Sequence, residues 1–99
     1  MKILHLTLKR KWFDLIASGE KRYEYREDKQ YWRTRLLCEC GNFRKFDIIR
    51  FRNGYSKDAR QIDVEFIGGA FTNSNTWNPQ HGEEFTGKII VLELGQVLA

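Results

Sequence analysis

Alternation of apolar and polar side chains with a two-residue period is the feature that most limits the fold of this chain. It recurs in four short segments, and a fifth segment near the C-terminal end is strongly apolar. Helical spacing appears only twice, and both times early in the chain. A doubly wound fold would repeat strand and helix along its whole length, and this chain does not. We therefore predict an α+β fold, a small and strongly bent sheet or barrel with two or three short helices over its openings.

The predicted elements are separated by turn-forming residues. The strands are expected at residues 2–8, 21–27, 46–52, 61–71 and 88–94. The first helix is expected at residues 9–18, with an apolar stripe of Trp12, Phe13, Ile16 and Ala17. Gly19 should end that helix, and Asp28 should cap a second one that carries residues 31–37. Gly68-Gly69 predicts a bulge or bend in the fourth strand. Residues 72–87 are expected to form a long loop of the kind that often carries function.

Length and composition place the chain in a broad class. Its 99 residues suit one domain. No apolar run approaches the roughly 20 residues of a membrane span, and the N-terminus lacks the layout of a signal peptide, so we expect a cytoplasmic protein without a membrane partner. Cys38 and Cys40 are too close in an extended strand for an easy disulfide, which predicts reduced thiols. They also lack the second ligand pair of a zinc site, so we expect no metal and no cofactor.

Charge is distributed unevenly along the sequence. Residues 1–60 contain 16 Lys and Arg against 8 Asp and Glu, whereas the remainder contains 1 basic and 5 acidic residues. A compact domain with this imbalance is expected to carry a positive field on one part of its surface. Such fields commonly attract polyanions, including nucleic acid. The alternative is a surface of mixed charge that serves only solubility.

The segment Gly19-Glu20-Lys21-Arg22-Tyr23-Glu24-Tyr25-Arg26 carries the most specific signal. It contains Gly-x-Lys-x-x-Glu-x-Arg, which ordinary residue frequencies would produce in about one in a thousand chains of this length. On a strand, Arg22, Glu24 and Arg26 share one face, opposite Lys21 and the two tyrosines. The plain alternative is an exposed edge strand whose charges protect against aggregation.

This motif, preceded by a strand and a helix and followed by strands that end in an apolar one, resembles the ASCH domains of the PUA-like superfamily. The resemblance covers Leu4 to about Gln96, so that residues 1–99 would form a single ASCH domain. It implies a small PUA-like β-barrel with a cleft beside the motif, and the binding of RNA or a nucleotide-like ligand. Some relatives are similar to amidohydrolases that act on acetylated cytidine, and others have been proposed as ribonucleases.

The binding hypothesis assigns Lys21, Glu24 and Arg26 to one wall of a basic cleft. Arg26 offers a planar fork suited to a phosphate or a nucleobase edge, and Glu24 is an acceptor that could equally hold Arg26 in place. Further ligand contacts are expected from Arg52, Tyr55, Lys9 and Lys11. The aromatic residues near the motif, Tyr23, Tyr25, Tyr31 and Trp32, could stack on bases, although at least two of them are expected to pack in the core.

Two other functions remain open from the sequence. The first is a small metal-free hydrolase for a modified nucleoside or RNA, with Lys21 as the base and Glu24 or Glu65 as the carboxylate. Lys21 matches the lysine of the amidohydrolase relatives, but Glu24 stands where they carry a nucleophilic threonine. The second is a protein-interaction module with no nucleic-acid ligand.

Overall fold

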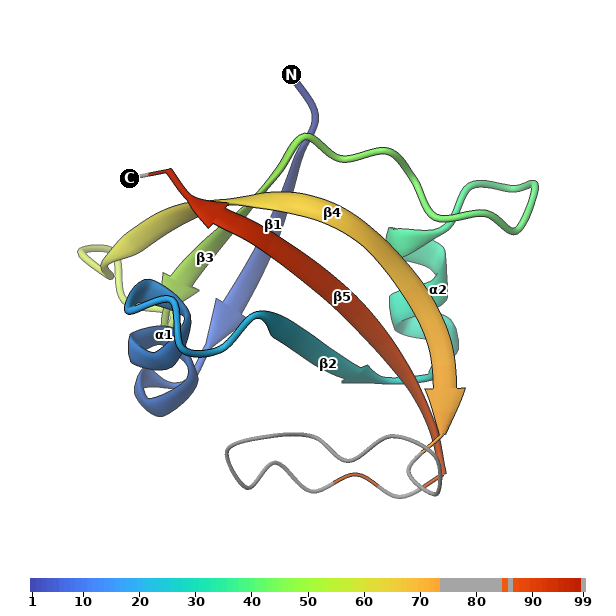
Figure 1. The fold of residues 1–99 in the computed structure, drawn as a ribbon, viewed down its shortest axis with the longest axis horizontal. Coiled ribbons are helices and arrows are strands. Elements are labelled where there is room, and N and C mark those ends of the chain that lie inside the picture. The colour runs from blue at the N-terminus through green and yellow to red at the C-terminus, as the bar shows by residue number, and fades with distance from the viewer. Residues whose placement is uncertain (74–84, 86, 99) are drawn as a thin grey trace.

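The computed structural model describes residues 1–73, 85 and 87–98, which form one curved five-stranded sheet and two helices (Figure 1). In chain order the elements are β1 (Ile3–Leu8), α1 (Arg10–Ala17), β2 (Tyr23–Glu27), α2 (Gln30–Leu36), β3 (Ile48–Asn53), β4 (Gln61–Asn73) and β5 (Lys88–Val97). The predicted α+β class, the five strands and the early position of both helices are therefore confirmed for this part of the chain. Most of the predicted loop at residues 72–87 lies outside the described residues.

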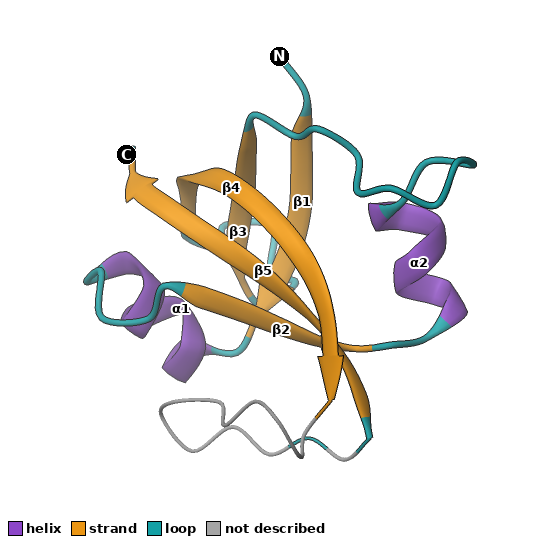
Figure 2. Cartoon of the chain, turned by 45° about the vertical axis from the view of Figure 1, so that its right-hand side comes forward, coloured by secondary structure: helices purple, strands orange, loops and turns teal. Residues whose placement is uncertain are grey.

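The strand order is β1-β3-β4-β5-β2, with β1 parallel to β3 and every other pairing antiparallel. The sheet curls into an open half-barrel, and α1 and α2 lie at opposite ends of its hollow in both views (Figures 1 and 2). The register of β4 against β5 is irregular between Val64 and Gly68, next to the predicted bend at Gly68-Gly69. Such irregularities let a long strand curve. The half-barrel leaves β1 and β2 as its two edges.

The core fills the concave side of the sheet, as the alternation predicts. It contains Leu4, Leu6, Leu8, Phe13, Ile16, Leu36, Ile49, Phe51, Ile62, Val64, Ile90, Leu92 and Leu94. Phe13 and Ile16 form the buried side of α1, which confirms the predicted apolar stripe of that helix. A smaller cluster of Tyr25, Ile89 and Val91 lies on the opposite side of β5, where Tyr23 and Phe85 pack against it.

The two helix boundaries differ in how well the sequence predicts them. α1 ends as expected, because Gly19 has a φ of 84°, a left-handed conformation that glycine adopts without steric cost. The predicted capping role of Asp28 is wrong: Lys29 is the N-cap of α2, and no side chain caps the helix. Asp28 instead accepts hydrogen bonds from Arg33 Nε at 2.5 Å and Nη2 at 2.8 Å. A guanidinium offers a carboxylate two parallel bonds, which are stronger than a single capping bond.

Asp28 should make stability depend on pH in the acid range. The hydrogen bond from Arg33 holds the pKa of Asp28 below its usual value of 3.8. The unfolded chain therefore binds the proton first, and the stabilisation present above about pH 3.8 is lost as the pH falls through the folded-state pKa. We expect Asp28→Asn to lower the unfolding free energy at neutral pH and to flatten its decline in acid, with the exposed Asp58→Asn as control. An acid decline as steep in Asp28→Asn as in the parent would contradict this.

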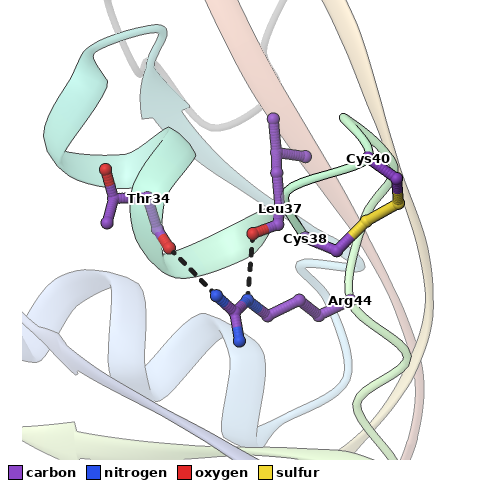
Figure 3. The surroundings of a disulfide bond; sticks show 5 residues. All are labelled: Thr34, Leu37, Cys38, Cys40 and Arg44. Atoms are coloured by element: carbon purple, nitrogen blue, oxygen red, sulfur yellow. Dashed lines mark hydrogen bonds between the residues drawn. A yellow bond between two sulfur atoms is a disulfide. The ribbon is translucent and has the colours of Figure 1, made fainter.

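Cys38 and Cys40 are joined by a disulfide, so the predicted reduced thiols are wrong (Figure 3). An extended segment would hold the two cysteines apart, but this segment forms a tight turn in which the N–H of Gly41 donates to the carbonyl of Cys38 at 3.0 Å. This turn brings the two Cα atoms to a distance of 5.2 Å, within the range that disulfides span.

No helix among the described residues is long and apolar enough to cross a membrane.

Candidate ligand-binding cleft

A cleft of about 690 Å³ opens at the seam where the edge strands β1 and β2 face each other without pairing. It is lined by the end of β1, the start of α1, β2, the start of α2, the turn after β3 and Phe85. The lining residues are Thr7, Leu8, Lys9, Arg10, Trp12, Glu24, Tyr25, Arg26, Glu27, Lys29, Trp32, Asn53, Gly54, Tyr55 and Phe85. Its volume lies within the range of about 300–1,000 Å³ that is usual for small-molecule sites.

Three charged residues of the motif form a chain of ion pairs, of which Glu24 and Arg26 line one wall of the cleft. Glu24 Oε2 lies 2.8 Å from Arg26 Nη2, and Glu24 Oε1 lies 3.4 Å from Lys21 Nζ. Oε1 also accepts a hydrogen bond from the N–H of Tyr25 at 3.1 Å. The side chains of Lys21 and Glu24 are only 2% and 3% exposed. Both charges are therefore buried, and each compensates part of the other's cost of burial.

Strand pairing explains why these charges face inward. Glu24 pairs with Leu92 of β5, and Arg26 pairs with Ile90. Leu92 and Ile90 both belong to the core on the concave side of the sheet. The prediction that Glu24 and Arg26 share a face is thus confirmed, and β2 is an edge strand as the plain alternative held. Its face with Glu24 and Arg26 is turned toward the hollow, however, and not toward solvent.

Lys21 lies behind the wall of the cleft and does not line it. β2 begins two residues later than predicted, so Lys21 precedes the strand, and its N–H donates to the carbonyl of Leu15 in α1 at 3.0 Å. Lys21 Nζ donates to the carbonyl of Tyr23 at 2.5 Å and lies 4.5 Å from the ring centre of Tyr25. A carbonyl, a carboxylate and an aromatic face are all partners of a protonated ammonium. This geometry makes Lys21 a support for Glu24.

Arg26, on β2, contacts both α2 and the facing edge strand β1. Its guanidinium lies 4.8 Å from the ring centre of Trp32 in α2, and Nη2 lies 3.4 Å from the carbonyl oxygen of Thr7 in β1. Its side chain is 19% exposed. Within the part of the chain that the structure describes, the buried Nε of Arg26 has no hydrogen-bond partner. Arg26 is therefore held in orientation while one of its donors stays unused.

The rim of the cleft is positively charged. Lys9, Arg10 and Lys29 are exposed lining residues, and Glu27 lies 2.9 Å from Lys29 in an exposed ion pair. Lys9 is the N-cap of α1, and the first turn of that helix holds no acidic residue. The positive end of the helix dipole therefore adds to the charge of the lysine.

The other predicted site residues are divided between the cleft and the rest of the surface. Tyr55 stands at the rim and is 90% exposed, and Lys9 lines the cleft as expected. Arg52, Lys11 and Glu65 are not among the lining residues. Arg52 follows the buried Phe51 in β3, so it points to the opposite face, where it donates to the carbonyl of Ser56 at 2.6 Å.

Lys11 and Glu65 have contacts of their own elsewhere. Lys11 Nζ lies 4.7 Å from the ring centre of Trp12. Glu65 Oε1 accepts from the N–H of Gln96 at 3.5 Å, on β4 away from the seam. The structure thus brings Glu24, Arg26, Lys9 and Tyr55 together at the cleft. Four other predicted residues lie outside its lining: Lys21, Arg52, Lys11 and Glu65.

Several lining residues had no clear signal in the sequence. Trp12 is predicted only as a core residue of α1, and Lys29 is not predicted as a contact at all. Trp32 is different, because it is one of the aromatic residues near the cationic motif that the sequence offers as stacking candidates, and it lines the cleft. The contact with the carbonyl of Thr7 could not have been predicted, because any residue at that edge position would supply the same backbone oxygen.

No family model, curated protein or solved structure matches this chain. Among the described residues, no group of three or more His, Cys, Asp or Glu side chains is placed to hold a metal ion.

Proposed function

We propose that this chain is a PUA-like domain of the ASCH type that binds single-stranded RNA or a nucleotide-like ligand in the cleft at the seam. The observation that carries the proposal is the unused donor of Arg26. A buried N–H without a partner costs about 1–3 kcal/mol, and within the described part of the chain Arg26 Nε is in that position. A phosphate oxygen or an acceptor on a nucleobase edge would accept the hydrogen bond that Arg26 Nε can donate.

The surroundings of Arg26 suit the same class of ligand. The ring of Trp32 already stacks on the guanidinium, and Tyr55 presents a second aromatic ring at the rim. Lys9, Arg10 and Lys29 supply cations along the opening. Sites for single-stranded nucleic acid commonly combine a positively charged groove with aromatic stacking platforms.

The cleft supports binding better than the hydrolase alternative. A base must reach the proton that it removes, and Lys21 lies behind the wall with its ammonium already engaged. Glu24 is held by Lys21 and Arg26, and Glu65 lies away from the lining residues. We therefore propose a binding function and assign no catalytic role.

Affinity for single-stranded RNA should fall steeply with salt, because each neutralised phosphate releases condensed counterions. Three rim cations would give a log–log slope of about −2, or roughly a tenfold to twentyfold loss between about 50 and 200 mM salt. Fluorescence anisotropy with a labelled RNA of mixed sequence measures this slope.

A pair of double variants tests whether the rim is responsible. Lys9→Ala with Lys29→Ala should flatten the salt slope, whereas Lys2→Ala with Lys45→Ala, two exposed lysines outside the cleft, should leave it unchanged. Salt-independent binding, or no binding at micromolar protein, would count against the proposed function.

A further inference from the structure

The turn that follows α2 holds a disulfide in an accessible position. Cys40 is exposed and Cys38 is half-buried, and their bond closes a loop of only three residues (Figure 3). Closing so short a loop restricts the unfolded chain little. The bond is therefore suited to hold the local shape of the turn more than to stabilise the whole domain.

This turn supplies the C-terminal cap of α2. Three backbone carbonyls at the end of the helix accept hydrogen bonds from a single residue, Arg44: Leu36 from its N–H at 2.8 Å, Leu37 from Nε at 3.0 Å and Thr34 from Nη2 at 3.5 Å. The last carbonyls of a helix have no partner within the helix. Arg44 reaches them because the chain reverses direction at Cys38–Cys40, as Figure 3 shows.

The reversal depends on few other contacts. The N–H of Cys38 donates to the carbonyl of Asn42 at 2.8 Å, the N–H of Gly41 donates to the carbonyl of Cys38 at 3.0 Å, and Leu37 forms an isolated bridge with Phe43. Phe43 packs against the core, with its ring centre 5.1 Å from that of Phe71. Loss of the disulfide would therefore leave residues 38–42 held by these backbone hydrogen bonds alone, while Phe43 keeps the far side of the turn attached.

We propose that Cys38–Cys40 is a reversible thiol–disulfide exchange site whose reduction loosens the C-terminal cap of α2. A thiolate of a small thiol attacks Sγ of Cys40, which forms a mixed disulfide and releases Cys38 as a thiolate. A second thiolate attacks the outer sulfur, which releases Cys40 and forms the disulfide of the small thiol. Each released thiolate takes a proton from water, so one protein disulfide and two thiols give two cysteines and one small disulfide. This proposal does not rest on RNA binding.

Equilibration in glutathione buffers tests the exchange itself. The reduced fraction, measured by alkylation and intact mass, should rise from nearly none to nearly all as the ratio of reduced to oxidised glutathione increases, with two alkyl groups added per reduced chain. A chain that stays fully oxidised or fully reduced over the whole range would overturn the proposal.

Hydrogen exchange tests the effect on the cap. Reduction of the parent protein should speed exchange at the amides of Leu37, Cys38 and Arg44 by about tenfold or more, while β3 and β5 change little. Arg44→Ala should speed exchange at Leu37 with the disulfide intact. Cys38→Ser with Cys40→Ser should show the fast rates with or without reductant. Equal exchange in oxidised and reduced protein would overturn the link between disulfide and cap.

Discussion

Glu24→Gln is expected to lower the free energy of unfolding by about 3–5 kcal/mol, the usual cost of removing one partner from a buried ion pair. Glutamine keeps the shape of the side chain but removes the negative charge that lies 3.4 Å from the ammonium of Lys21, whose side chain is 2% exposed. It also removes the carboxylate that holds Arg26 at 2.8 Å. Lys21→Met should cost less, because Glu24 keeps Arg26 as a partner.

Thermal unfolding followed by circular dichroism measures this effect. For a domain of this size, each kcal/mol corresponds to about 4–8 °C in Tm, so Glu24→Gln should unfold at least about 12 °C lower than the parent. Glu27→Gln is the matched control, because it makes the same change in the exposed pair with Lys29, where both side chains are more than half exposed. We expect it to move stability by no more than about 1 kcal/mol. Similar losses in both variants would contradict a special role for the buried pair.

Arg26→Ala is expected to weaken binding of single-stranded RNA by about tenfold or more, since a hydrogen bond to a charged group contributes about 1.5–3 kcal/mol. Its effect on the fold should be smaller than that of Glu24→Gln, because Glu24 retains Lys21 and the N–H of Tyr25. Arg26→Lys should also weaken binding, since lysine keeps the charge but loses the planar fork and its stacking on Trp32.

Binding titrations must be compared with melting curves for the same variants. Arg22→Ala is the control within the motif, because Arg22 is exposed and does not line the cleft, and its affinity should stay close to that of the parent. If Arg26→Ala lost stability but bound RNA as tightly per folded molecule, the motif would be part of the scaffold and the proposed binding site would be wrong.

Most of the secondary structure was predictable because it depends on local features. Alternation in β1 and the apolar stripe of α1 predict the buried residues of both elements. Gly19 ends α1 where a left-handed residue is needed. Local rules failed where a non-local or competing partner existed. Asp28 pairs with Arg33 instead of capping α2, and Cys38 meets Cys40 because the chain turns between them.

The sequence by itself determined that Glu24 and Arg26 lie on one face of a strand, because side chains alternate along any strand. Only the tertiary structure decided that this face is the inner one. The register with β5 places Glu24 opposite Leu92, and the curl of the sheet brings the carbonyl of Thr7 in β1 to Arg26. Both contacts join residues distant in the chain, so no local pattern encodes them. The cleft exists because the two edge strands approach each other without pairing, which is a property of the whole sheet.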